Sequence, residues 1–345
     1  MISLLEYLTE SKSQSFTLTA VGDALCHESI YQYFKTKDGY DFTSLFSKYK
    51  LNKDNLNYVN VESIIGGKEL GLAGSISKLE GNTYQAHFNS PEEFGDVLVK
   101  QGFNLMSLAN NHVLDMDESG VINSLKYWSK QPVIYAGSYK NKKDRFEKHV
   151  YEKNGIKYAF FAYTMKYNTK QNFQNHPFYR NDWDEELIKK DISAVRDEVD
   201  LIIVSVHWGS EHTFTPNQDQ RNAATFLAEQ GVDIVLGMHS HCVQPVQFIG
   251  NTLVAYSLGN FIAQQLHDPT DSRIGLELNV NVVKKNNTIT LKPEFRLLYM
   301  YYTQDYKKFK VIPFDELSLN QLPNKKLLQK TYSDVVNKYK VFGNI

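Results

Sequence analysis

The chain has 345 residues, of which 42% are hydrophobic, and its formal net charge is −1. This length allows one large domain or two. A net charge near zero excludes a global electrostatic attraction to nucleic acid or to an anionic membrane surface. The chain shows no nucleic-acid signature, and nothing in it indicates an oligomeric state.

The amino-terminal segment and the apolar runs bear on localisation. Glu6 and Glu10 stand in a segment where a signal peptide would carry basic residues, and its apolar part is too broken for a signal sequence. The best apolar run, residues 158–163, is far shorter than the ~20 residues that a membrane-spanning helix requires. We therefore expect a cytoplasmic protein without a membrane segment.

The chain contains two cysteines, Cys26 and Cys242, which are too few for the disulfide framework of a secreted protein. Each stands beside a histidine that we consider as a ligand. The two thiols could be soft metal ligands or a redox pair. Packing of two small side chains near a pocket is the favoured interpretation.

Asp23 and His27 follow the first predicted strand. Residues 1–14 predict a short helix or arm, and apolar residues then alternate with threonine over residues 16–20, which is typical of a strand. A carboxylate and an imidazole released together at a strand end are suitable metal ligands. The alternative is that Asp23 caps a helix.

Glu62 follows the second predicted strand, residues 56–61. A carboxylate at this point is either a solvated loop charge or an acid held in a cleft. The next stretch, residues 66–81, is rich in glycine and carries lysines, which predicts an excursion from the sheet.

Asn111 and His112 follow a strand predicted over residues 103–109. The helix before it is predicted to start with a capping box over residues 90–93 and to end at Gly102. An amide oxygen can coordinate a hard cation, and an imidazole can transfer protons. A simple Asn-Asn turn is the alternative.

The middle of the chain continues the alternation of helices and strands, and His207 ends one of these strands. The pattern predicts a helix near residues 121–128, strands over 132–136 and 157–163, a long loop over 166–181 that could cover the cleft, a helix from Asp184 and a strand over 201–206 that ends at His207.

His239 and His241 follow a buried strand predicted over residues 232–236. A second capping box, over residues 215–218, opens the helix before this strand. Gly237 is expected to let the backbone turn sharply at the strand end. In open α/β sheets ligands collect at the carboxyl ends of strands, so the two imidazoles are candidate ligands. A His-x-His pair taken alone is more often two ordinary loop residues.

The last part of the sequence predicts an antiparallel hairpin. A strand over residues 274–282 alternates apolar and polar residues and returns over 289–301. Arg273 could hold a substrate anion, and Asn260 could face the pocket; a surface arginine and a turn asparagine are the alternatives. We expect one domain over residues 15–305 and a C-terminal surface extension over 306–345.

Taken together, the candidate ligands predict one site. Alternating strands and helices predict an α/β sheet that brings the carboxyl ends of its parallel strands to one edge. Carboxylates, imidazoles and one amide oxygen suit Zn, Mn or Fe better than Ca or Mg. The donors exceed what one tetrahedral ion uses, so we predict two divalent ions that activate water against a phosphoryl group, with His112 assisting the leaving oxygen. The predicted set is Asp23, His27, Glu62, Asn111, His112, His207, His239 and His241.

The motifs that carry these residues resemble the CapA family, the poly-γ-glutamate capsule biosynthesis proteins, a branch of the calcineurin-like metallophosphoesterases. The resemblance rests on Gly22-Asp23 with His27, Asn60 to Glu62, Leu108 to His112 with Leu114-Asp115, His207 to Gly209, Gly237 to His241 with Gln244-Pro245, and Tyr256 to Phe261. It implies a four-layer αββα sandwich of two mixed β-sheets with a dinuclear metal centre at its edge.

The resemblance also implies individual roles. Asp23 looks like the aspartate of the first motif, and Glu62 stands where related enzymes have a bridging aspartate. Asn111 and His112 look like the asparagine ligand and the proton-donating histidine. The remaining imidazole ligands are matched by His207, His239 and His241. The chain departs from the family at Ser240, where proline is common, and in the longer acid at position 62.

The sequence therefore predicts a metal-dependent hydrolase that cleaves a phosphoester or related bond. Its substrate would be a phosphorylated small molecule or an anionic polymer. Two alternatives remain open: a non-hydrolytic role in the assembly of poly-γ-glutamate or another envelope polymer, and amide hydrolysis at the same metals, because activated hydroxide also attacks carbonyl groups.

Overall fold

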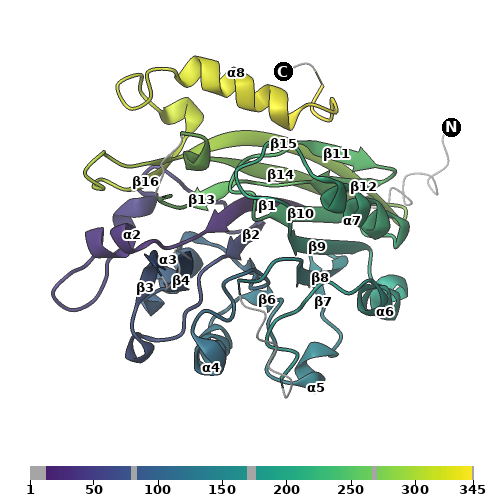
Figure 1. The fold of residues 1–345 in the computed structure, drawn as a ribbon. Helices are drawn as coiled ribbons and strands as arrows, with labels where there is room; N and C mark the ends of the chain where they lie inside the picture. Colours follow the sequence, from purple (N-terminus) through teal and green to yellow (C-terminus); the bar gives the residue numbers. More distant parts are fainter. Residues whose placement is uncertain (1–12, 79–83, 169–175, 266–269, 344–345) are drawn as a thin grey trace.

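Two β-sheets pack face to face, with helices against the outer face of each (Figure 1). The computed structural model describes residues 13–78, 84–168, 176–265 and 270–343. It confirms the four-layer αββα sandwich of two mixed sheets. Most of the arm predicted over residues 1–14 lies outside the described residues, and the first strand begins at Gln14.

The first sheet has eight strands in the order β16-β15-β14-β1-β2-β5-β6, with β13 also paired to β1. Strands β1, β2, β5, β6 and β13 are parallel to their neighbours among themselves, whereas β14, β15 and β16 pair antiparallel. The bounds are β1 Gln14–Ala24, β2 Leu56–Val61, β5 Leu105–Ser107, β6 Ile134–Ala136, β13 Asn260–Ile262, β14 Ile274–Lys285, β15 Thr288–Tyr301 and β16 Lys310–Pro313. The predicted late hairpin is confirmed as β14 and β15.

The second sheet has six strands in the order β11-β12-β10-β9-β8-β7. Its four central strands are parallel, and its two edge strands are antiparallel to their neighbours. The bounds are β7 Val150–Lys153, β8 Ile156–Thr164, β9 Leu201–His207, β10 Ile234–Met238, β11 Val246–Ile249 and β12 Thr252–Ala255. A separate two-stranded hairpin, β3 Ala73–Lys78 and β4 Tyr84–Asn89, occupies part of the predicted excursion.

The helices are short and lie mostly between successive strands. Their bounds are α2 Glu28–Tyr33, α3 Glu92–Gln101, α4 Asp117–Trp128, α5 Lys142–Arg145, α6 Glu185–Val195, α7 Gln218–Glu229 and α8 Lys325–Val336. The 3-10 turns are η1 Thr43–Phe46, η2 Lys68–Leu70, η4 Arg196–Glu198, η5 Thr270–Arg273 and η6 Phe314–Glu316. Among the described residues no helix has both the length and the apolar character needed to cross a membrane.

Both predicted capping boxes needed correction. Helix α3 starts from Pro91 without a side-chain cap, because the hydroxyl of Ser90 is hydrogen-bonded to that of Ser63 instead. Helix α7 does begin with a capping box, but its partners are Asn217 and Gln220, so the box lies two residues later than the sequence pattern suggested. The αL conformation of Gly102 ends α3 as predicted.

The strands of the second sheet are buried on both faces, and successive side chains enter different cores. In β8, Phe160 packs between the two sheets, while Phe161 packs under α6 and α7. Strand β9 repeats this pattern with Ile203 and Val204. Continuous apolar runs of this kind are typical of parallel strands covered on both faces. The sandwich therefore holds its strand ends in fixed positions along one edge.

Two glycines near the strand ends are required by close backbone approach. A Cβ at Gly22 would lie 1.8 Å from the carbonyl oxygen of Gly259, and one at Gly237 would lie 2.1 Å from that of Tyr256. The predicted turn at Gly237 was wrong, because β10 continues through it to Met238. The backbone turns at His239 instead, where φ is 92°.

Candidate metal centre

The ends of both sheets contribute side chains to one buried cluster. Asp23 lies on β1, Glu62 directly follows β2, and His207 ends β9. His239 and His241 follow β10, and all five side chains are buried. The two sheets meet here through the backbone N–H of His239, which donates to Asp23 Oδ2 at 3.2 Å. The predicted convergence of strand-end residues is thus present.

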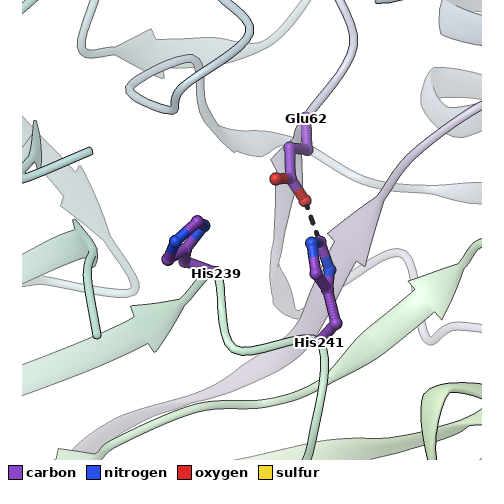
Figure 2. A group of neighbouring side chains, drawn as sticks. All are labelled: Glu62, His239 and His241. Atoms are coloured by element: carbon purple, nitrogen blue, oxygen red, sulfur yellow. Dashed lines mark ion pairs between the residues drawn. The ribbon is translucent and has the colours of Figure 1, made fainter. Parts of the chain in front are cut away.

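Glu62 lies at the centre of the imidazoles. Its Oε1 is 3.3 Å from His207 Nε2, and its Oε2 is 3.8 Å from His241 Nδ1. One ligand atom from each of Glu62, His239 and His241 lies within 4.8 Å of the others, and Figure 2 shows the glutamate and His241 pointing toward each other. This spacing allows a single cation to contact all three side chains.

Several polar atoms of this cluster have no hydrogen-bond partner among the described residues. They include both carboxylate oxygens of Glu62 and the Nδ1 of His239. A buried carboxylate without hydrogen bonds is costly unless a cation compensates its charge. The donor set, with oxygen and imidazole nitrogen atoms, suits a transition-metal ion. The residues present therefore fit a bound metal.

The raised pKa values of Asp23 and Glu62 also favour a bound cation. Burial, with a smaller contribution from Glu62, raises the pKa of Asp23 to about 6. Burial likewise raises the pKa of Glu62. Ionising both acids side by side is unfavourable without a positive partner. A divalent cation would supply that partner.

The imidazoles of the cluster are held mainly in the form that binds metals. Burial lowers the pKa of His207 to about 3 and also lowers the pKa of His239 well below its usual value. Neutral imidazole is the coordinating form. His241 differs: burial opposes its charge, but the neighbouring Glu62 and Asp23 carboxylates raise its pKa above the ordinary value.

Two asparagines orient this cluster. Asn60 Nδ2 donates to Asp23 Oδ1 at 2.7 Å and lies 3.4 Å from His207 Nδ1. Asn260, which pairs with Asp23 across β13 and β1, places its Oδ1 3.0 Å from His241 Nδ1. The sequence interpretation assigned no role to Asn60. Its partners Asp23 and His207 are distant in the sequence, so no local pattern identified its role.

Asn111 and His112 border the cluster on the side of the first sheet. The Oδ1 of Asn111 lies 2.9 Å from His207 Nε2, and its Nδ2 lies 3.2 Å from His112 Nε2. His112 Nδ1 contacts Asp115 Oδ2 at 2.7 Å. Burial would lower the pKa of His112, but the Asp115 carboxylate raises it above the ordinary value. Asp115 also accepts from the backbone N–H of Phe88 on β4.

His27 occupies the border of the site with a different set of contacts. Its Nδ1 lies 3.2 Å from Leu25 O and 3.1 Å from the backbone N of Gln264, and its ring packs edge-on against Phe88. Burial lowers the pKa of His27 to about 3, so the ring is neutral. Its role as a metal ligand stays a prediction.

Arg273 is engaged with Tyr302. Its guanidinium lies 3.6 Å from the centre of the Tyr302 ring and donates to the Tyr302 carbonyl oxygen at 3.1 Å. Substrate binding by Arg273 stays a prediction, as does substrate binding by Asn260, whose Nδ2 donates to Ser272 O at 2.8 Å.

The two thiols beside the site are free and buried. Burial raises the pKa of Cys242 to about 12 and that of Cys26 further still. Cys26 belongs to the apolar core on the outer face of the first sheet. These environments accord with the packing interpretation, because reactive cysteines have a lowered pKa.

The histidines after β10 carry unusual backbone angles. His239 has φ 92° and His241 has φ 54°, values that are uncommon for residues other than glycine. Such conformations cost free energy and persist where the surrounding structure holds them, often at functional sites. The turn places both rings in the cluster, with ring centres 6.1 Å apart.

A two-sheet sandwich whose strand ends gather buried acids, amides and imidazoles defines the chain as an α/β protein with a candidate metal centre. The chain belongs to the family described as bacterial capsule synthesis protein PGA_cap, whose model matches residues 17–265. This match confirms the CapA resemblance and covers the stretch from β1 to the residues just after β13.

Two relatives carry capsule-related names. The chain is 30% identical over 190 residues to the PGA biosynthesis protein CapA of Bacillus subtilis (strain 168), across 52% of this chain and 48% of that protein. It is 28% identical over 184 residues to the capsule biosynthesis protein CapA of Bacillus anthracis, across 52% and 44%. The chain thus spans about half the length of these relatives.

Among solved structures, the chain is similar to a putative 5'-nucleotidase from Staphylococcus aureus in complex with alpha-ketoglutarate. The TM-score is 0.43 at 12% sequence identity, and the match covers 93% of this chain and 58% of the other.

Proposed function

We propose that the chain is a metal-dependent hydrolase whose strand-end centre binds two divalent ions and activates water against a phosphoester or a related bond. The observation that carries this proposal is the buried carboxylate of Glu62, which lies among imidazoles and accepts no hydrogen bond from the described residues. A metal cation would supply both oxygens with the partner that no hydrogen bond provides.

The proposed ligands are Asp23, Glu62, Asn111, His207, His239 and His241, with His27 as a further candidate. Oxygen and imidazole donors favour Mn, Zn or Fe. When bound, a pair of such ions polarises a phosphoryl oxygen and lowers the pKa of water enough to supply hydroxide near neutral pH. Glu62 would be one of the carboxylate ligands that hold the metal.

The proton that the leaving oxygen requires would come from a residue of the chain, His112. Donation from His112 Nδ1 to Asp115 holds the ring in one orientation, and the carboxylate favours the protonated ring. A protonated His112 can give the proton on Nε2 to the leaving oxygen. Asp115 does not touch the substrate in this scheme and acts as a positioning residue.

The proposal is tested by adding metal back to stripped protein. After chelation, the protein is loaded with Mn²⁺ or Zn²⁺, and hydrolysis of a panel of phosphomonoesters and phosphodiesters is measured. We expect cleavage that depends on the added metal. Bound metal without cleavage of any panel member would refute hydrolysis of phosphoesters.

A second candidate function follows from the names of the two relatives, which refer to PGA and capsule biosynthesis. In this second function the site acts on an anionic polymer such as poly-γ-glutamate, and it either cleaves the amide bonds of the polymer or binds the polymer during assembly. Incubating metal-loaded protein with poly-γ-glutamate separates amide cleavage from phosphoester cleavage. Co-purification with an ATP-dependent amide ligase that survives His112→Ala would favour the non-hydrolytic role.

A further inference from the structure

Asn168 reaches the candidate centre from the opposite sheet. It lies on the segment that leaves β8, whereas Asn111 and His112 follow β5 of the first sheet. Its Oδ1 accepts from Asn111 Nδ2 at 3.1 Å, and its backbone N–H faces Asn111 O at 3.4 Å. Its Nδ2 lies 3.3 Å from His112 Nδ1. Asn168 thus contacts both residues from across the sandwich.

The segment that carries Asn168 is anchored at its start. The backbone N–H of Met165 donates to the carbonyl oxygen of His207 at 2.9 Å. Thr164 Oγ1 donates to Lys166 O at 2.6 Å and accepts from Lys166 N at 3.0 Å, which closes a turn. The same histidine whose ring faces Asn111 therefore also fixes the segment that approaches Asn111 from the other side.

The contacts of Asn168 bear on the orientation of the Asn111 carboxamide. Its oxygen and nitrogen are close in shape, and the last torsion of asparagine has a broad, roughly two-fold profile, so hydrogen bonds decide which atom faces which way. With Oδ1 toward His207, the two N–H groups point to His112 Nε2 and to Asn168 Oδ1. Rotation by half a turn would bring a nitrogen against His207 and remove the donor from Asn168.

We infer that Asn168 is a positioning residue that keeps the amide oxygen of Asn111 directed into the metal centre. The inference rests on the proposed function, because it treats Asn111 as a ligand. The amide oxygen of Asn168 is the required element: it accepts one N–H of Asn111, while the other N–H faces His112 Nε2, which is an acceptor only while the ring is neutral. Outer partners of this kind typically contribute 10–100-fold to metal affinity.

The test compares Asn168→Leu with Asn168→Asp by titrating Mn²⁺ into metal-free protein and measuring heat. Leucine has a similar size but no acceptor, so we expect Mn²⁺ affinity to fall by about 10-fold or more. Aspartate keeps an oxygen acceptor at the same position, so its affinity should stay close to that of the unsubstituted protein. Asn168 is exposed, so thermal unfolding of the metal-free variants should be unchanged.

Tyr167→Leu is the matched control, because it alters the exposed neighbour on the same segment and leaves the Asn168 oxygen in place. The inference is overturned if Asn168→Leu binds Mn²⁺ as tightly as the unsubstituted protein. It is also overturned if Asn168→Asp or Tyr167→Leu is weakened as much as Asn168→Leu. Failure of the unsubstituted protein to bind Mn²⁺ would instead refute the proposed metal centre.

Discussion

The candidate site has two parts that differ in how many of their buried polar atoms have hydrogen-bond partners within the chain. The ligand group consists of Asp23, Glu62, Asn111, His207, His239 and His241, and the acid–base group consists of His112 and Asp115. In the ligand group both oxygens of Glu62 and the Nδ1 of His239 have no hydrogen-bond partner among the described residues. In the acid–base group both ring nitrogens of His112 have contacts.

This difference indicates what each part needs. Buried polar groups in proteins are nearly always paired, so a cluster of unpaired ones calls for a partner from outside the chain. The ligand group has the charge and donor types for a cation. The acid–base group is already oriented by protein contacts and needs only a substrate.

The largest expected effect tests whether the acid–base group affects turnover without affecting metal binding. Replacing His112 with alanine removes the proposed proton donor, so turnover of a phosphoester substrate should fall by about 10²–10⁴-fold. Mn²⁺ affinity, measured by calorimetry, should change far less. His176→Ala is the control, because His176 is a half-exposed histidine paired with Glu118. Equal losses of turnover and metal affinity in His112→Ala would erase the distinction between the two parts.

The next effect concerns the ligand group. Glu62→Gln keeps the shape of the side chain but removes the charge, and Mn²⁺ affinity should fall by at least about 100-fold, more than outer partners contribute. Glu277→Gln provides a matched comparison. Glu277 is also buried, but Tyr49 and Arg296 donate to its carboxylate. Metal affinity should be unchanged in Glu277→Gln, and a similar loss in both variants would argue against Glu62 as a ligand.

The same Glu62→Gln variant should be more stable than the unsubstituted protein when both are metal-free. A buried carboxylate that accepts no hydrogen bond is costly, so we expect a gain of roughly 1–3 kcal/mol in the free energy of unfolding at pH 7. Because burial raises the folded-state pKa of Glu62 above its usual 4.5, the ionised form destabilises the fold as pH rises through that interval. Below pH 4.5 the residue is protonated in both states, and the gain should vanish.

Chemical denaturation at pH 7 and at a pH below 4.5, each in the presence of a chelator, measures this difference. Adding Mn²⁺ at pH 7 should reverse the ranking, because the metal stabilises only a protein that binds it. A destabilised Glu62→Gln protein without metal would show that the carboxylate already has a partner within the fold.

The smallest expected effect is a shift in pH dependence. Asp115→Asn removes the carboxylate that raises the pKa of His112. A general acid must be protonated, so activity is lost as pH rises through its pKa, and the loss should move to lower pH in Asp115→Asn. The measurement is kcat/KM for a phosphoester against pH. An unchanged high-pH limb would indicate that another group supplies the proton.

The strand-end ligands were predictable because they depend on local patterns. A buried strand is recognisable by its apolar run, and the carboxyl ends of parallel strands in one sheet share an edge. Asp23 and Glu62 follow this rule within the first sheet, and His207 follows it within the second. Each could therefore be recognised as a strand-end residue from the sequence, whereas the meeting of the two sheets could not.

Other features could not be predicted from local patterns. The turn expected at Gly237 was wrong because glycine is needed there for close approach to the carbonyl oxygen of Tyr256, which directly follows the neighbouring strand β12. Which strand is the neighbour depends on the order of strands in the sheet. The hydroxyl of Ser90 contacts Ser63 and not its own helix. Asn60 and Asn168 gain their roles only from side chains distant in sequence.

By itself, the sequence determined the alternation of strands and helices, the buried character of the strands and the set of residues released at their ends, because these follow from periodicity over a few neighbouring positions. Only the tertiary structure decided how the two sheets face each other, and therefore which polar atoms find partners and which do not. Pairing of buried groups depends on distances of about 3 Å between segments that meet only after folding. Only there could it be recognised that the carboxylate of Glu62 accepts no hydrogen bond from the described residues.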